Sequence, residues 1–164
     1  MDLLERIQSS LHQIKNTLKA DSDIRKLLYY TTKNSLSKSE VSYSSMENFI
    51  TLRPVFNMNT ETFNRSSFLT IAISEMEELE DEKIFDGVLR INIICKNDNW
   101  ELDNQGVRPL KIVGKIKNLL DKKKFDSSHK LLFMNMQIVT LDEDHSGYMV
   151  LFRIVEGAGL ENEF

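Results

Sequence analysis

The side chain best suited to chemistry in this chain is its single cysteine, Cys95, which ends an apolar stretch. Leu89, Ile91, Ile93 and Cys95 alternate with polar residues. A nucleophilic cysteine needs a base or a positive field to form its thiolate. Cys95 shares an apolar face instead, so we expect it to be a small core residue. Trp100 follows the next polar turn, and we expect it to anchor that loop to a sheet or to contact another subunit or a partner.

The three histidines, His12, His129 and His145, lack the spacing typical of metal sites and catalytic motifs. His12 falls on the polar side of a predicted helix, and His129 opens a predicted strand. His145 follows three acids, residues 142–144, and such a group could bind a divalent cation. The Ser-Gly pair after it favours a hairpin turn instead. We therefore expect no catalytic, metal or cofactor site.

One short stretch, SEMEELEDEK, carries the largest cluster of like charge. Its acids are Glu75, Glu77, Glu78, Glu80, Asp81 and Glu82. Paired catalytic carboxylates normally come from separate elements that meet in a pocket, whereas an acidic run is usually a solvated loop. We predict an exposed acidic loop. In a symmetric oligomer this loop would be repeated around the axis and create a negative zone.

The overall composition is that of one soluble domain. The 164 residues are 41% hydrophobic and 28% charged, which is ordinary for a folded protein. A net charge of −4 argues against a broad basic surface that grips nucleic acid. A single cysteine cannot form an internal disulfide, and the chain shows neither a signal peptide nor a membrane span. We expect a cytosolic product with no membrane partner.

Two helices are predicted at the N-terminus, within residues 1–31. Spacings of three and four residues place one apolar stripe on a helix, formed by Leu4, Ile7, Leu11, Ile14 and Leu18. Asp21 or Ser22 can cap a second helix that ends near Thr31. The stripe can dock on its own domain or on another chain. Residues 32–48, rich in Ser, Lys and Asn, are predicted to form a loop.

Alternating apolar residues predict four strands, at 66–74, 88–96, 130–140 and 147–157. In the third strand, Leu132, Met134, Met136 and Ile138 are expected to share one face. A helix from Pro109 lies between the second and third strands, and the lysines at 122–124 suit its C-terminal end. The prediction is one α+β domain over 1–164: a mostly antiparallel sheet with one helix packed on it, preceded by two N-terminal helices.

This order of elements resembles a known family of phage proteins. The strand and loop LRINIICKNDNW, the helix VRPLKIVGKIKNLLDKK and the hairpin strands KLLFMNMQIVT and YMVLFRIVEG follow a strand and an acidic loop. The arrangement is similar to the tail terminator (tail-completion) proteins of tailed bacteriophages over about residues 50–156. The resemblance rests on element order and not on a diagnostic residue motif, and the first two helices lie outside it.

The resemblance implies a virion structural protein without enzymatic activity, assembled in the host cytoplasm. Such a subunit forms a ring, typically a hexamer, that caps the tail tube and joins it to the neck. Its partners would be other copies, the tail tube protein and neck or connector proteins, with DNA only as passing cargo. The acidic loop would then face the channel or an interface, and Trp100 would be a second interface candidate. Alternatives are a head-completion adaptor or stopper, a small soluble binding domain, or an enzyme with an unrecognised site.

Overall fold

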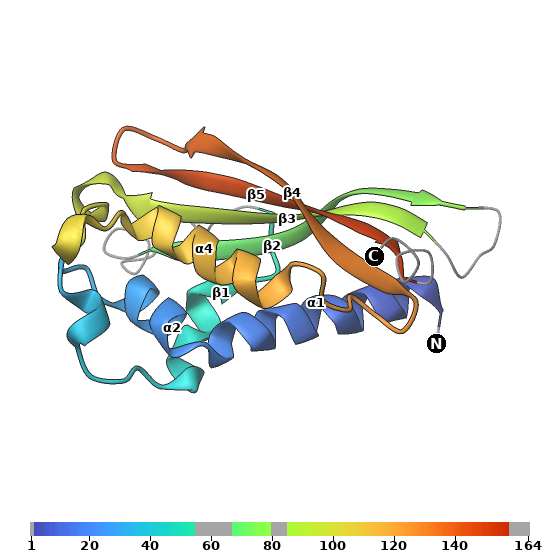
Figure 1. The fold of residues 1–164 in the computed structure, drawn as a ribbon, viewed down its shortest axis with the longest axis horizontal. Helices are drawn as coiled ribbons and strands as arrows, with labels where there is room; N and C mark the ends of the chain where they lie inside the picture. The colour runs from blue at the N-terminus through green and yellow to red at the C-terminus, as the bar shows by residue number, and fades with distance from the viewer. Residues whose placement is uncertain (1, 55–66, 80–84, 158–164) are drawn as a thin grey trace.

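The computed structural model describes residues 2–54, 67–79 and 85–157. The described residues form two layers, a five-stranded sheet and a layer of helices that covers one of its faces (Figure 1). The predicted class, α+β with a mostly antiparallel sheet and two helices at the N-terminus, is confirmed.

The two N-terminal helices are α1, Leu3–Ala20, and α2, Ser22–Tyr29. Asp2 begins α1 with a capping box, in which its side chain accepts the Glu5 N–H at 2.8 Å. Asp21 caps α2 as predicted, because its carboxylate accepts the Ile24 N–H at 2.9 Å.

The stripe predicted on α1 docks on its own domain. Ile7, Ile14 and Leu18 are buried in the common core, whereas Leu4 is 59% exposed. The segment predicted as a loop at 32–48 contains two short 3₁₀ helices, η1 at Ser35–Ser37 and η2 at Tyr43–Asn48. It leads into β1, Ile50–Thr51.

The remaining elements are two strands, two short 3₁₀ turns, one long helix and two further strands. They are β2 Phe68–Glu78, β3 Phe85–Lys96, the 3₁₀ turns η3 Asn97–Asn99 and η4 Asp103–Gln105, α4 Arg108–Leu120, β4 His129–Thr140 and β5 His145–Glu156. The strand order is β1-β2-β3-β5-β4. The short β1 runs parallel to β2, and all other neighbours are antiparallel.

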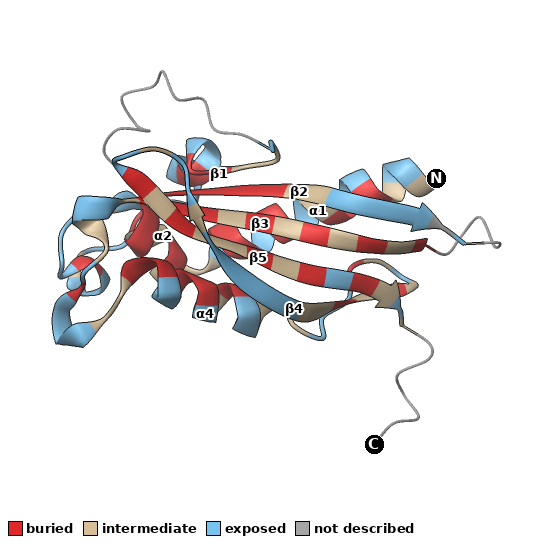
Figure 2. Ribbon diagram, turned by 90° about the horizontal axis from the view of Figure 1, so that it is seen from above, coloured by how far each residue is buried: buried red, intermediate tan, exposed pale blue. Residues whose placement is uncertain are grey.

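The core lies between the sheet and the helices α1, α2 and α4, so more than the single predicted helix covers the sheet (Figures 1 and 2). Leu89, Ile91 and Ile93 of β3 are fully buried on this inner face, as the alternation in the sequence predicts. The opposite face, which we call the outer face, carries Arg90 and Asn92 of the same strand.

The acidic cluster departs from its prediction as a loop. Strand β2 continues through a bulge after Ile73, so Glu75, Glu77 and Glu78 are strand residues. They pair with the beginning of β3, which starts at Phe85, three residues before the predicted start at 88. Glu80, Asp81 and Glu82 lie outside the described residues.

The predicted apolar face of β4 is wrong, because a second bulge falls between Phe133 and Asn135. Residues paired across a ladder point to the same face. Leu132 pairs with Arg153 on the outer face, whereas Met136 pairs with Val150 on the inner face. An extra residue inserted in one strand reverses the alternation beyond it.

Candidate interaction surface

The most nucleophilic candidate of the sequence, Cys95, lies in the core. It is fully buried on β3, and burial raises the pKa of its thiol to about 11. Trp100 lies after η3 and packs on Tyr148 of β5 with ring centroids 6.0 Å apart. This contact holds the η3 loop against the sheet, as expected of an anchor. Cys95 therefore offers no accessible thiolate, and Trp100 is half-buried.

Two of the histidines occupy the same local motif, an Asp-x-x-His turn at the start of a strand. The carboxylate of Asp126 accepts the backbone N–H of His129 and lies 2.8 Å from its Nδ1. Asp142 does the same for His145, with its Oδ1 at 2.9 Å from Nδ1. Hydrogen bonding from His145 lowers the pKa of Asp142. His12 is exposed on α1, so the three histidines do not meet.

Both ring nitrogens of His129 form hydrogen bonds within the protein. Its Nε2 accepts the Phe85 N–H at 3.2 Å, so the proton of the neutral ring is assigned to Nδ1, beside Asp126. Both ring nitrogens are thus occupied, and the side chain is completely buried. The Asp126–His129 pair joins the start of β4 to the start of β3.

Arg108, at the start of α4, is a buried charge that the sequence did not predict. It is fully buried, and its guanidinium donates to the carbonyls of Asn99, Leu27 and Thr32 and to Ser35 Oγ at 2.5–2.9 Å. These acceptors belong to three separate loops or helix ends. Arg108 therefore ties α4 to the end of α2, to the start of η1 and to the end of η3.

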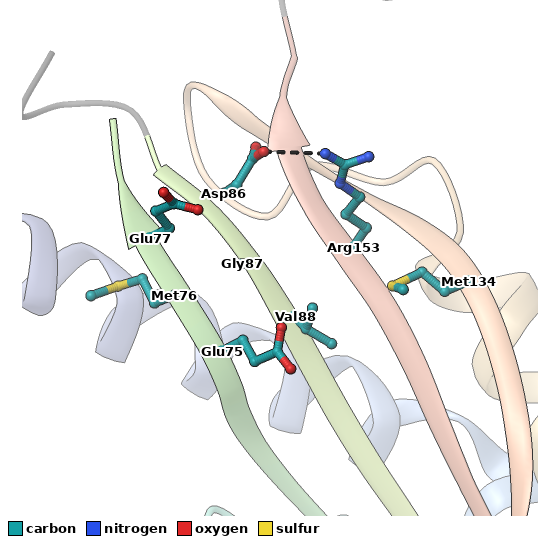
Figure 3. Close-up of a pocket in the computed structure, with 8 residues that line it drawn as sticks. All are labelled: Glu75, Met76, Glu77, Asp86, Gly87, Val88, Met134 and Arg153. Carbon is teal, nitrogen blue, oxygen red and sulfur yellow. Dashed lines mark hydrogen bonds and ion pairs between the residues drawn. The ribbon is translucent and has the colours of Figure 1, made fainter. Parts of the chain in front are cut away.

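The outer face of the sheet carries a groove of about 490 Å³ (Figure 3). It is lined by Glu75, Met76, Glu77, Asp86, Gly87, Val88, Met134 and Arg153. The groove thus contains Glu75 and Glu77 of the predicted acidic cluster together with residues of β3, β5 and the bulge of β4. Sequence reasoning did not find the other lining residues, since a groove formed by twist and a bulge has no local sequence signature.

The groove is acidic. Arg153 is engaged by Asp86 at 3.2 Å, as the dashed line in Figure 3 indicates. Glu75 and Glu77 are exposed and form no ion pair with the part of the chain that the structure describes. Met134, 46% exposed, adds an apolar contact surface on the opposite side of the groove. Such a surface suits a partner that brings positive charge and aliphatic stems.

The far edge of the sheet, strand β4, is uncharged over its second half, where apolar residues alternate with Asn135 and Gln137. Met136 and Ile138 lie on the inner face beyond the helices and are 43% and 68% exposed. The chain has no charged residue from Leu131 to Leu141. Natural edge strands are usually protected by charges or proline. The absence of both here marks the β4 edge as a second surface that suits protein contact.

Neither a metal site nor a membrane-spanning helix is found within the described ranges. No cluster of three or more His, Cys, Asp or Glu side chains in residues 2–54, 67–79 and 85–157 is placed to hold a metal ion. None of the helices in those ranges is long and apolar enough to span a membrane. The acids beside His145, the cation-site alternative of the sequence, form the turn between β4 and β5.

Comparison with known proteins identifies a matching family. The YomW family model, which describes phage SPbeta-like proteins, matches residues 21–154. The matched range begins at the cap of α2 and ends near the end of β5. No curated protein and no solved structure matches the chain.

Proposed function

We propose, because the chain belongs to the YomW family of phage SPbeta-like proteins, that it is a virion structural subunit. It assembles into a ring, typically of six copies, that caps the tail tube and joins it to the neck. The phage family and the α+β fold support this proposal, together with the resemblance of residues 50–156 to tail terminator proteins.

The observation that carries the proposal is the distribution of surfaces on the sheet. One face is covered by helices, while the outer face holds the groove and β4 ends in an exposed uncharged edge. A subunit that contacts neighbours on two sides needs two such surfaces. By contrast, the reactive candidates Cys95 and His129 are buried. These two exposed surfaces support assembly as the proposed role.

Passage of DNA through the ring is part of the proposal. A net charge of −4 leaves the subunit without a strong attraction for phosphates. DNA is then cargo that moves through the channel, and the bound partners are the tail tube and the neck. The protein is made in the host cytoplasm and ends in the virion.

Deletion of the gene from the phage or prophage that carries it tests the proposal. We expect separate filled heads and finished tails, and restoration of joined particles when the chain is supplied in trans. Gold-labelled antibody should mark the head–tail junction of complemented particles. Intact joined particles after deletion, with no label on wild-type virions, would exclude a virion role. Label at the portal with tails still capped would instead favour a head-completion adaptor or stopper.

A further inference from the structure

The two edges of the sheet carry opposite charges at the same end. On the β2 edge, β1 pairs only with Leu69 and Thr70, and no described strand covers β2 beyond them. Glu75 and Glu77 lie on this open part of the strand. We call this part of β2 the acidic edge. Met76, 40% exposed, adds apolar surface to it.

The opposite edge is basic because the connection from α4 lies along β4. The Leu131 N–H donates to the Lys123 carbonyl at 2.9 Å, and the Lys122 N–H donates to the Leu131 carbonyl at 2.8 Å. Lys124 forms a further bridge with Lys130. The exposed Lys123 and Lys124 form no ion pair with any residue that the structure describes. We call Lys123 and Lys124 the basic edge.

Strand pairing places the acidic edge and the basic edge at the same position along the strands, which we call the same level. Met76 pairs with Gly87, Gly87 with Ile154, and Ile154 with Leu131, to which the basic edge is bonded. The row therefore starts between Glu75 and Glu77 and ends at Lys123.

The opposite charges cannot neutralise one another within one subunit. Four steps of about 4.8 Å separate the two edges, which is roughly 19 Å. The Debye length in physiological salt is about 8 Å, so attraction across the sheet is largely screened. Each edge keeps its charge available for a neighbour.

We infer that the acidic edge of one copy docks against the basic edge of the next copy, head to tail. The inference rests on the proposed function, because this contact would be the interface between subunits of the proposed ring. If neighbouring copies are related by rotation about an axis parallel to the strands, no residue shifts along the strand direction. Glu75 and Glu77 of one copy then meet Lys123 and Lys124 of the neighbouring copy. A contact between two different surfaces propagates and closes into a ring when the rotation allows it.

A two-fold contact between equal edges does not satisfy these charges. Antiparallel pairing of two β2 edges brings Glu75 and Glu77 toward the uncharged Phe68–Thr70 end of the other copy. Pairing of two β4 edges brings Lys123 toward the uncharged second half of β4. Only the head-to-tail contact gives both charge sets an opposite partner. Such complementarity fixes register and partner choice.

Charge reversal on the full chain tests this contact. The variants E75K/E77K and K123E/K124E each place like charges across the interface, and we expect each to raise the self-association Kd at least about tenfold. An equimolar mixture should recover association, because both kinds of contact between the two variants are then complementary. Sedimentation velocity at low and high salt measures the species. E143K/D144K, on the β4–β5 turn, adds the same charge as E75K/E77K and should associate like wild type.

The outcomes separate this inference from the proposed function. Wild-type rings that persist unchanged in both reversal variants would overturn the interface and leave the ring intact. A chain that stays monomeric at every concentration, alone and in the mixture, would also overturn it. Labelling of the head–tail junction is independent of these measurements and decides the virion role. Matching thermal unfolding curves for all variants would show that the charge changes act on the interface and not on folding.

Discussion

Replacement of Arg108 by methionine should destabilise the protein strongly, because the Arg108 side chain is fully buried. Methionine keeps most of the aliphatic stem and removes the guanidinium that donates to Asn99, Leu27, Thr32 and Ser35. These four acceptors lose their charged donor, and the contacts to the Leu27 carbonyl and Ser35 Oγ are fully buried. Unsatisfied buried acceptors are costly, so the loss exceeds that of a surface charge.

The expected magnitude follows from two opposing terms. Hydrogen bonds to a charged group contribute about 1.5–3 kcal/mol each, so four amount to about 6–12 kcal/mol. Removal of the guanidinium also removes its desolvation cost, which is several kcal/mol. We expect a net loss of about 3–5 kcal/mol in the free energy of unfolding, the range typical of a broken buried ionic contact. At about 2–4 °C per kcal/mol, the Tm should fall by roughly 6–20 °C.

Urea unfolding followed by circular dichroism measures this loss, with R153M as the matched control. Arg153 is 56% exposed and makes an ion pair with Asp86, so R153M should cost less than about 1 kcal/mol. R108K should not restore stability, because one compact ammonium cannot reach acceptors in three segments. The reasoning would be refuted if R108M unfolded at the same urea concentration as R153M.

Two further predictions concern titration and reactivity. Hydrogen bonds from Lys15 and then Lys19 lower the pKa of Glu47 to about 2, so its contribution to stability is complete above about pH 4.5 and is lost as the pH falls toward about 2. The stability difference between wild type and E47Q, from urea midpoints at a series of pH values, should therefore shrink over that interval; a constant difference would contradict the assignment. Burial raises the pKa of Cys95 to about 11, so a thiol reagent at neutral pH should label it only after unfolding in urea. Rapid labelling of the native chain would instead show that the Cys95 thiol is accessible in the folded protein.

The fold was predictable where periodicity alone determines the structure. The caps at Asp21 and the stripe through Ile14 and Leu18 are local signals, and each is found in place. Alternation likewise identified the inner face of β3. These features depend on residues a few positions apart, so the sequence contains their cause.

The missed features depend on contacts between distant segments. The bulge in β4 reverses the face of Met136, and no residue type near it requires an extra residue. Arg108 is buried because carbonyls 76 and 81 residues away converge on it. The acidic run predicts a loop because a run of like charges is usually solvated, whereas pairing with β3 extends β2 through Glu78. Tertiary pairing thus overrides local preference at these three positions.

The uncharged edge of β4 has a consequence for the supply of this subunit. A long apolar edge strand without charges pairs readily with other extended chains, including misfolded ones. The segment Leu131–Leu141 also combines strand-forming residues with no proline and no charge. Chains made in excess are therefore exposed to aggregation, and the loss rises with concentration. Slow synthesis would protect the yield of folded protein without any change to the fold.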